Sequence, residues 1–409
     1  MLISPRWHRL ARSLVASTPI RIVQAAGLGL AAGFALVRSG EARIISLPAS
    51  SRSDRIALLS YTIAPFAGRG RAPSPDPTAA WVSLTLARLL RQRGWNVDVV
   101  SDANIAFVPA RPYGVVIASR RSLSRLAPRL PTECIKVLYL DGADVLVQHA
   151  AECDRLLDLK DRRQVVLSPV RFERTTLALE QAACAIVQGN ALTLNGYRHA
   201  RIPLHRVATV ATVEQPSPQS KDFEACRRSF VAPGTRGLVH QGLDRTLEAF
   251  AALPDHHVTV YAPVHRERQF QEAYRRELRD TPNIHTARWR GLGHQRLGAL
   301  ARKAVGLVFP SSAEGQAQEV VAGMAAGLIP IVTREAGVDV EGFGVVLPGP
   351  SPAEVSKAVR DLSALPAPRL CEMAAEAWHC ARSRHSPDVV ARRLDEILQE
   401  VLTDPPPAG

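Results

Sequence analysis

The sequence predicts an α/β protein with two tandem Rossmann-like domains and a ligand cleft between them. Three observations lead to this prediction. The chain has 409 residues, which is too long for one ordinary core. Short apolar runs alternate with amphipathic helical segments, as in a parallel sheet covered by helices on both faces. The alternation is interrupted by a polar stretch at 214–221 and then begins again.

The first domain is expected over residues 51–213. Residues 78–95 have apolar side chains at helical spacing and a glycine, Gly94, near the end, so they predict a helix. The apolar runs predict strands at 56–61, 96–101, 114–119, 135–140, 165–168, 184–188 and 207–213.

A linker is expected at 214–228, because residues 214–221 include two prolines and two serines but no apolar side chain. The second domain is expected over 229–386, and the last helix, 387–403, is expected to cross back onto the first domain. The pattern predicts strands at 237–239, 258–264, 284–287, 305–310, 329–333 and 344–348, and helices at 243–253, 266–279, 295–303, 315–327, 352–362 and 367–384.

The positive charge is concentrated near the N-terminus. Residues 1–71 contain ten arginines and two acidic residues, which gives +8 of the total net charge of +13. A nucleic-acid-binding protein is expected to spread arginines and aromatic residues over a folded face, so no nucleic-acid partner is expected. Residues 1–50 are instead predicted to form a basic, partly apolar arm.

Within this arm, residues 22–37 are uncharged. A helix of this length would span about 24 Å, short of the ~30 Å hydrocarbon core of a bilayer. We favour an interfacial helix held on anionic lipid by the flanking arginines. A helix packed on the domain surface, a disordered leader and a signal peptide are the alternatives. The expected location is the cytoplasm, with peripheral attachment to the inner face of the membrane.

Composition adds two further expectations. The abundance of arginine and alanine suggests a GC-rich bacterial genome. The six cysteines have neither CxxC spacing nor neighbouring histidine clusters, which disfavours a zinc site or a disulfide framework. They are expected to be small buried side chains in a reducing compartment.

Residues 305–333 contain the strongest candidate site. A buried strand leads into the polar turn SSAEG at 311–315, and a helix of small residues follows and ends at Gly327. Such a turn and helix N-terminus present several backbone N–H groups, which attract phosphate. The alternative is a plain strand-turn-helix unit in which the serine and glutamate side chains only cap the helix.

This segment resembles the group 1 (family 4) retaining glycosyltransferases, which have the two-domain GT-B fold. Their hallmark is a glutamate, seven residues, a second glutamate and a small-residue helix that ends near a glycine and a proline. Glu314 matches the first glutamate, whereas the second falls on Ala322 and is absent. Glu319 is acidic but lies three positions early. The resemblance implies that Glu314 approaches the hydroxyls of the donor sugar.

Residues 235–250 resemble the start of the family's donor-binding domain, where an arginine precedes a lysine-glycine pair by five positions. Arg236 stands at the arginine position and Gln241-Gly242 at the lysine-glycine position. Both cations face the donor diphosphate in the family, but only one is kept here. Exchanging a charged donor for a neutral one costs about 1 kcal/mol of binding, unless another arginine compensates. On the acceptor side, a long loop at 65–77 replaces the family's usual Gly-Gly turn.

The resemblance implies a transferase that moves a sugar from a nucleotide-sugar donor to an acceptor hydroxyl, with retention, in bacterial glycan or glycoconjugate biosynthesis. The acceptor class stays open between a glycan, a lipid-linked molecule and a small molecule. No cofactor is implied, because the nucleotide sugar is a substrate, and no Asp-x-Asp metal motif is present. The implied catalytic residues are Glu314, Arg236 and, on the first domain, Asp141. The implied donor-binding residues are Arg236, Gln241, Ser311, Ser312, Glu314, Gly315 and Glu319.

Other interpretations remain open. The absence of the second glutamate and of the lysine fits a degenerate member that binds nucleotide sugar without turnover. A nucleotide-sugar epimerase of the same fold is disfavoured, because the cleft segments lack a set of histidine and carboxylate proton carriers. Asp144 and Asn190 also follow strands of the first domain, but turn or helix-cap roles are the better interpretation for both.

Overall fold

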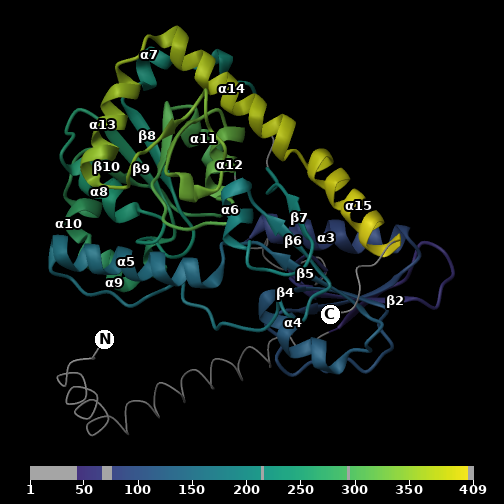
Figure 1. Cartoon of the computed structure of the whole chain (residues 1–409). Coiled ribbons are helices and arrows are strands. Elements are labelled where there is room, and N and C mark those ends of the chain that lie inside the picture. The colour runs from purple at the N-terminus through teal and green to yellow at the C-terminus, as the bar shows by residue number, and fades with distance from the viewer. Residues whose placement is uncertain (1–43, 67–75, 213–215, 293–294, 404–409) are drawn as a thin grey trace, which may run out of the picture.

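The computed structural model describes residues 44–66, 76–212, 216–292 and 295–403. Two α/β domains lie side by side, and a pair of C-terminal helices runs along both (Figure 1). This confirms the predicted two-domain α/β class. No helix within the described ranges is long and apolar enough to cross a membrane.

The first domain is built on a seven-stranded sheet in the order β1-β3-β2-β4-β5-β6-β7. All neighbouring strands are parallel except β1, which is antiparallel to β3 and pairs Ile45 with Val99. β2, β4 and β6 are buried along their whole length, as their uninterrupted apolar runs predict. The strands are β1 (Ile45–Leu47), β2 (Ile56–Tyr61), β3 (Asn96–Ser101), β4 (Val115–Ser119), β5 (Ile135–Leu140), β6 (Cys184–Gln188) and β7 (Leu204–Val207), and the helices between them are α3 (Pro77–Gln92), α4 (Arg120–Leu126), α5 (Val145–Arg163) and α6 (Ala191–Gly196).

The second domain has a six-stranded, wholly parallel sheet in the order β10-β9-β8-β11-β12-β13. Its strands are β8 (Ser229–Pro233), β9 (His257–Tyr261), β10 (Ile284–Thr286), β11 (Gly306–Phe309), β12 (Ile329–Val332) and β13 (Val345–Val346), and its helices are α7 (Phe223–Cys226), α8 (Leu243–Ala251), α9 (Arg268–Ala273), α10 (Arg275–Arg279), α11 (Gln295–Ala301), α12 (Gln318–Ala325) and α13 (Pro352–Ser363). The carboxyl ends of these parallel strands meet at one edge of the sheet, which is where open α/β sheets bind ligands.

The two C-terminal helices connect the domains. α14 (Ala367–His385) packs on α12 and β12 of the second domain. α15 (Pro387–Thr403) packs on α3 and β7 of the first domain, where Val390, Leu394 and Leu398 are buried in its core. Figure 1 shows the turn between the two helices at the gap between the domains.

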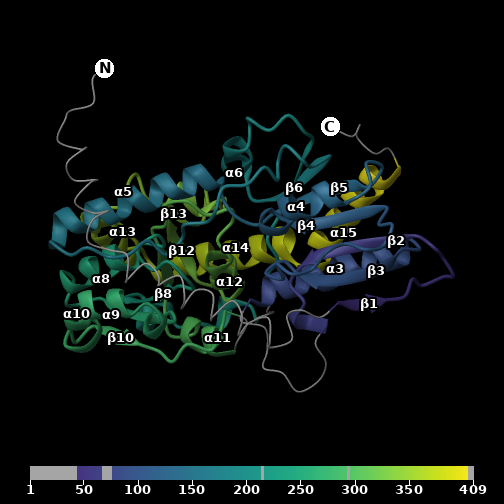
Figure 2. The ribbon, with the colours of Figure 1, turned by 90° about the horizontal axis from the view of Figure 1, so that it is seen from below.

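Helix α5 follows β5 of the first sheet but packs against the second domain (Figures 1 and 2). Leu159 is fully buried in the core of that domain. Two arginines at the end of α5 form ion pairs with it: Arg162 lies 2.7 Å from Asp244 and Arg163 lies 2.6 Å from Glu277. The helix therefore belongs to the first domain by sequence and to the second by contact.

Several predicted elements are wrong in place or length. Residues 165–168 form no strand. They are a loop after α5 in which Leu167 packs on the core of the second domain and the Ser168 N–H donates to Gln269 at 2.9 Å. Residues 237–239 form a turn, because Gly237 adopts a left-handed conformation with φ of 76°. The strand that opens the second domain is β8, which precedes this turn. The predicted helix at 266–279 is divided into α9 and α10 at Tyr274.

Strand β1 lies inside the stretch expected to be an N-terminal arm. Leu47 packs against the core of the first domain, so the sheet begins before residue 50. Residues 1–43, which include the apolar stretch 22–37, lie outside the described residues. Four of the six cysteines are buried, whereas Cys153 is exposed and Cys371 is half-buried.

The packing of α5 predicts a contrast between two leucines of one helix. Leu159 is fully buried, whereas Leu157 is 57% exposed. Leu159→Ala should lower the free energy of unfolding by about 2–5 kcal/mol, because it leaves a cavity in the second domain. Leu157→Ala should change it by less than about 0.5 kcal/mol. Equal effects in urea unfolding would contradict the docking of α5.

Candidate functional site

The two segments with family resemblance meet at the carboxyl edge of the second sheet. The loop 234–242 follows β8, and the turn 311–317 follows β11. Gly242 brings them into contact: its φ is 78°, and a Cβ there would overlap the carbonyl oxygen of Pro310. Only glycine meets both demands, so it fixes the start of α8 against the end of β11.

Gln241 and Glu319 are bonded to each other across this contact. The Gln241 amide donates to Glu319 Oε1 at 2.9 Å and to Thr235 Oγ1 at 3.2 Å. Thr235 also donates to Glu319 at 2.5 Å. Burial raises the pKa of Glu319, and the nearby Glu314 carboxylate raises it further. The neutral side-chain amide of Gln241 is therefore already hydrogen-bonded to the buried carboxyl group of Glu319.

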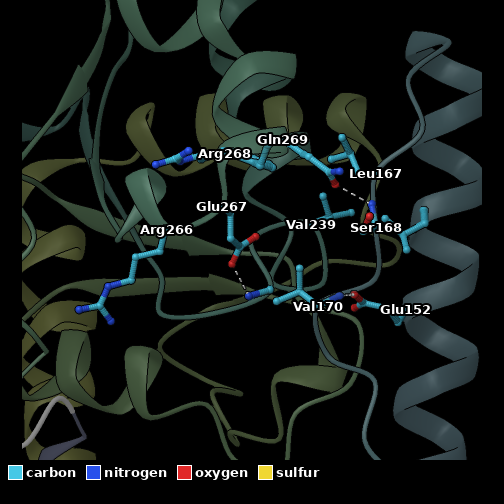
Figure 3. Close-up of a pocket in the computed structure, with 12 residues that line it drawn as sticks. Glu152, Leu167, Ser168, Val170, Val239, Arg266, Glu267, Arg268 and Gln269 are labelled. Carbon is cyan, nitrogen blue, oxygen red and sulfur yellow. Dashed lines mark hydrogen bonds between the residues drawn. The ribbon is translucent and has the colours of Figure 1, made fainter. Parts of the chain in front are cut away.

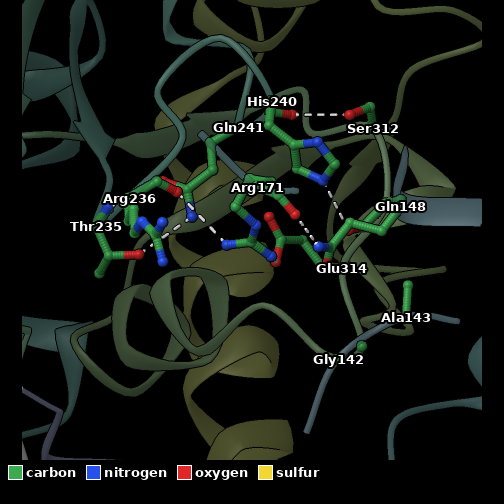
Figure 4. A network of polar contacts seen from close by, with 12 residues as sticks. Gly142, Ala143, Gln148, Arg171, Thr235, Arg236, His240, Gln241, Ser312 and Glu314 are labelled. Atoms are coloured by element: carbon green, nitrogen blue, oxygen red, sulfur yellow. Dashed lines mark hydrogen bonds and ion pairs between the residues drawn. The ribbon is translucent and has the colours of Figure 1, made fainter. Parts of the chain in front are cut away.

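Glu314 forms an ion pair with Arg171, a residue that belongs to none of the recognised sequence motifs. The Arg171 guanidinium lies 2.9 Å from Glu314 Oε2, and the two side chains are 19% and 9% exposed. Burial alone would lower the pKa of Arg171, but the carboxylates of Glu314 and Glu319 outweigh it and raise that pKa. Figure 4 shows the two side chains pointing at each other below the loop that carries Arg236.

The position of Arg171 is fixed by α5. Glu152 of α5 accepts hydrogen bonds from the backbone N–H groups of Val170 at 2.7 Å and Arg171 at 3.2 Å, and Gln148 donates to the Arg171 carbonyl. Glu152 also lies 2.9 Å from Nδ1 of His240. His240 in turn bonds the carbonyl of Ala313 at 2.8 Å through Nε2. One buried chain of contacts thus joins α5 to the turn that holds Glu314.

Arg236 lies at the rim of the site. Its side chain is exposed and donates to the carbonyl of Val170 at 2.9 Å. The next two backbone N–H groups, of Gly237 and Leu238, donate to the carboxylate of Glu267 at 2.6 and 3.0 Å. Burial raises the pKa of Glu267. The Glu267 carboxylate therefore already accepts hydrogen bonds from the two backbone amides beside the expected diphosphate position.

The turn 311–317 offers fewer free N–H groups than the sequence suggested. Ser312, Glu314 and Ala317 donate their backbone N–H groups to backbone carbonyls at 2.8–3.0 Å. These bonds pin the turn to neighbouring loops, so α12 begins at Gln318 instead of at Gly315. The amides of Ala313 and Gly315 have no acceptor among the described residues.

Two cavities flank this site. One of about 380 Å³ lies between α5 and the loop before α9, with Val170, Val239 and Glu267 in its wall (Figure 3). The other, of about 750 Å³, lies at the ends of β11, β12 and β13. Ser311 and Ser312 line the larger cavity, and neither Glu314 nor Arg236 does. These serines therefore open onto a cavity that Glu314 and Arg236 do not line, although Ser312 Oγ lies 3.1 Å from the carbonyl of His240, the neighbour of Gln241.

Arg155 of α5 and Arg245 of α8 stand in the wall of the larger cavity. Arg155 donates to the carbonyl of Pro310, and burial lowers its pKa to about 10. Arg245 lies 2.8 Å from Asp158, an acid of the same cavity wall. The wall of this cavity thus carries both arginine and carboxylate side chains.

The first domain meets the site through the end of β5. Asp141 is exposed there and accepts a hydrogen bond of 2.6 Å from the Tyr61 hydroxyl. Burial and the Asp141 carboxylate raise the pKa of Tyr61. Gly142 follows directly, and a Cβ at Gly315 would lie only 2.8 Å from its Cα. The two domains are therefore in backbone contact one residue from Asp141.

Asp144 and Asn190 are helix caps, as the sequence suggested. Asp144 accepts from the N–H groups of Leu146 and Val147 at the start of α5, and Asn190 caps α6 in the same way. Asn190 additionally donates to Asp339 of the second domain at 2.8 Å. In the described ranges, no cluster of three or more histidine, cysteine or carboxylate side chains could hold a metal ion.

Several solved structures have a similar two-domain architecture. The sucrose-phosphate synthase of Thermosynechococcus elongatus matches with a TM-score of 0.61 and 13% identity, over 86% of this chain and 100% of that chain. A glycosyltransferase of Rickettsia africae matches with a TM-score of 0.57 and 12% identity, over 86% and 100%. The chain has the GT-B fold.

HepE of Anabaena, solved in complex with UDP and glucose, also has this fold. It matches with a TM-score of 0.55 and 13% identity, over 85% of this chain and 99% of that chain. No protein-family model and no curated protein sequence matches the chain. At 12–13% identity these likenesses show the fold alone.

The raised pKa of Glu319 predicts a pH dependence of stability. Since its folded-state pKa lies above the unfolded value of about 4.3, Glu319 favours folding when protonated, and this contribution is lost as the pH rises through the folded pKa. Glu319→Gln cannot ionise. It should therefore be more stable than the native protein at neutral pH, with little difference near pH ~4.

Urea unfolding between about pH 4 and 8 measures this difference. The matched control is Glu335→Gln, which changes an exposed carboxylate at the same edge of the sheet. It should show no such pH-dependent gain. If Glu319→Gln were destabilised equally at every pH, the prediction would be wrong, and the native fold would depend on the carboxyl group of Glu319.

Proposed function

We propose that this protein is a glycosyltransferase that moves a sugar from a nucleotide-sugar donor to an acceptor hydroxyl. The observation that carries the proposal is that Arg171 contacts both Glu314 and the carbonyl of Arg236, while Gln241 bonds Thr235, the neighbour of Arg236. Arg236, Gln241 and Glu314 are thereby held around one site. They come from two distant segments and lie at the carboxyl edge of the second sheet, beside the contact with the first domain. The fold is one that HepE, solved with UDP and glucose, also has.

The arrangement suits transfer with retention by displacement on one face of the sugar. Arg236 and the unbonded amides of Ala313 and Gly315 would stabilise the charge that develops on the leaving diphosphate. Glu314 would orient the sugar through its hydroxyls, so that the attacking and leaving oxygens are held together. Ser311 and Ser312 are left outside this assignment, because they face the larger cavity.

Asp141 would stand on the acceptor side. It is an exposed carboxylate at the end of β5, held by Tyr61, and the adjacent Gly142 touches the turn of Glu314. An acceptor hydroxyl between the domains could donate a hydrogen bond to it. We infer that the acceptor belongs to bacterial glycan or glycoconjugate synthesis.

Binding without turnover is the second candidate. It is favoured by the pairing of Glu314 with Arg171, since a carboxylate engaged in an internal ion pair does not bind a sugar. The neutral Gln241 and the half-buried Ala322 at the position of the second family glutamate point the same way. Donor hydrolysis separates the two candidates: a transferase releases sugar slowly to water, and a binding protein does not.

Two substitutions test the proposed roles. Arg236→Ala removes a cation from the diphosphate, so the affinity for a nucleoside diphosphate should fall about ten- to a hundredfold. Glu314→Ala should not weaken this binding, because a nucleoside diphosphate has no sugar for it to hold. It should instead lower turnover of the nucleotide sugar. Calorimetric titration and a donor-hydrolysis assay measure the two effects.

Lys357→Ala is a suitable control, because Lys357 is an exposed residue of α13 that pairs with Asp361. It should change neither quantity. If Arg236→Ala and Glu314→Ala weakened nucleoside diphosphate binding equally, the separate roles would be wrong. If neither changed binding or turnover, the transferase proposal would fail.

We further propose that the basic arm attaches the protein to the inner face of the membrane. This rests on the +8 charge of residues 1–71 around the uncharged stretch 22–37. Removal of residues 1–43, which leaves β1 intact, should abolish sedimentation with anionic liposomes and leave the melting temperature unchanged. Zwitterionic liposomes serve as the control. Undiminished sedimentation of the shortened protein would exclude the arm as the membrane anchor.

A further inference from the structure

The expected diphosphate position lacks one of its two cations. Gln241 stands where the resemblance places a lysine, and its amide is already bonded to Glu319 and Thr235. Glu314 and Glu319 both lie close by, so the surroundings are rich in negative charge. A diphosphate could not enter such a site unless another cation balanced these carboxylates.

Arg171 supplies a positive charge at this place. Its side chain packs on Gly237, where a Cβ would lie 2.6 Å from Arg171 Cγ. One guanidinium nitrogen lies 2.9 Å from Glu314 and another 3.4 Å from the carbonyl of Arg236. Arg171 thus lies between the residue expected to hold the sugar and the loop expected to hold the diphosphate.

The rest of the fold places this side chain. The backbone of residues 170–171 is held by Glu152 and Gln148 of α5, and α5 is docked on the second domain through Leu159. Gly237 allows the close approach, because any other residue there would collide with the arginine. A side chain held by so many buried contacts is part of the architecture of the site and not a loose surface charge.

We propose that Arg171 is the second cation of the donor site and replaces the lysine that is missing at position 241. When a nucleoside diphosphate enters, the guanidinium leaves Glu314 and binds the phosphate oxygens, and Glu314 becomes free for the sugar hydroxyls. This inference rests on the proposed transferase function. It also gives the donor site a residue that belongs to the first domain by sequence and to the second by contact.

The exchange has a chemical rationale. A guanidinium forms paired hydrogen bonds with phosphate as well as with carboxylate, so one partner can replace the other. A diphosphate carries more charge than a monophosphate and extends further towards Glu314. The site should therefore favour nucleoside diphosphates over monophosphates, and Arg171 should be the cause. If Arg171 only neutralised Glu314 and blocked the site, its presence would lower the affinity for nucleoside diphosphates, and its removal would raise that affinity.

The test compares Arg171→Ala, Arg171→Lys and the native protein by calorimetric titration with UDP, ADP and GDP and with the corresponding monophosphates. Arg171→Ala should weaken binding of the preferred diphosphate at least about tenfold and binding of its monophosphate less than about threefold. Arg171→Lys should lie between the native protein and Arg171→Ala, because it keeps the charge and loses the paired geometry.

Arg163→Ala is the matched control, since Arg163 at the end of α5 pairs with Glu277 away from the site. It should leave both affinities unchanged. If Arg171→Ala does not fold, Arg171→Gln, which keeps a long polar side chain and loses the charge, decides: diphosphate binding as tight as in the native protein overturns the inference. If Arg171→Ala binds the diphosphate as tightly as the native protein or more tightly, the inference is also overturned, and Arg171 would then obstruct the donor site. A native protein that binds none of the diphosphates and hydrolyses no nucleotide sugar overturns the proposed function as well.

Discussion

The ion pair between Arg171 and Glu314 is the contact on which the arrangement of the site depends. It joins a segment that follows α5 to the turn at the end of β11, and both side chains are largely buried. Burying two charges costs more than their attraction returns unless further bonds complete the geometry. Glu314 Oε1 has no hydrogen-bond partner among the described residues, so the pair itself is incomplete. The two segments are held instead by the chain Glu152–His240–Ala313 and by the bonds from Glu152 to the amides of residues 170–171. The pair therefore adds little to stability, and its partners can be exchanged while the surrounding bonds keep the two segments together.

This constraint explains the unusual course of α5. The helix leaves the first sheet after β5 and packs on the second domain, with Leu159 in its core and Arg162 and Arg163 in ion pairs. α15 makes the reverse connection, from the second domain to the core of the first. Each domain thus contributes one helix to the other.

Much of the fold could be predicted from the sequence, because buried parallel strands carry uninterrupted apolar runs. The strands β2, β3, β5 and β6 lie where those runs lie. The run at 237–239 misled because its residues are buried in a turn, where Gly237 takes a left-handed conformation. The sequence pattern predicts a start at residue 315 for the helix after β11, but α12 begins at Gln318. The intervening turn is held by hydrogen bonds to distant loops, which a local pattern does not reveal.

Candidate site residues could be named from the sequence only where a local motif existed. Glu314, Arg236 and Gln241 stand in recognisable strings, and the structure brings them together. Arg171, Glu152 and Glu267 stand in no motif, since their roles arise from the docking of α5 and of the loop before α9. No spacing in the sequence encodes that docking. Charge pairing across the domains becomes visible only when the chain is folded.

The most direct measurement is a crystal structure of the native protein with the nucleoside diphosphate that raises its melting temperature most. We expect the diphosphate within hydrogen-bond distance of Arg236 and Arg171, and the pair between Arg171 and Glu314 broken. A diphosphate bound elsewhere, such as in the cavity lined by Ser311 and Arg155, with this pair intact, would contradict the account.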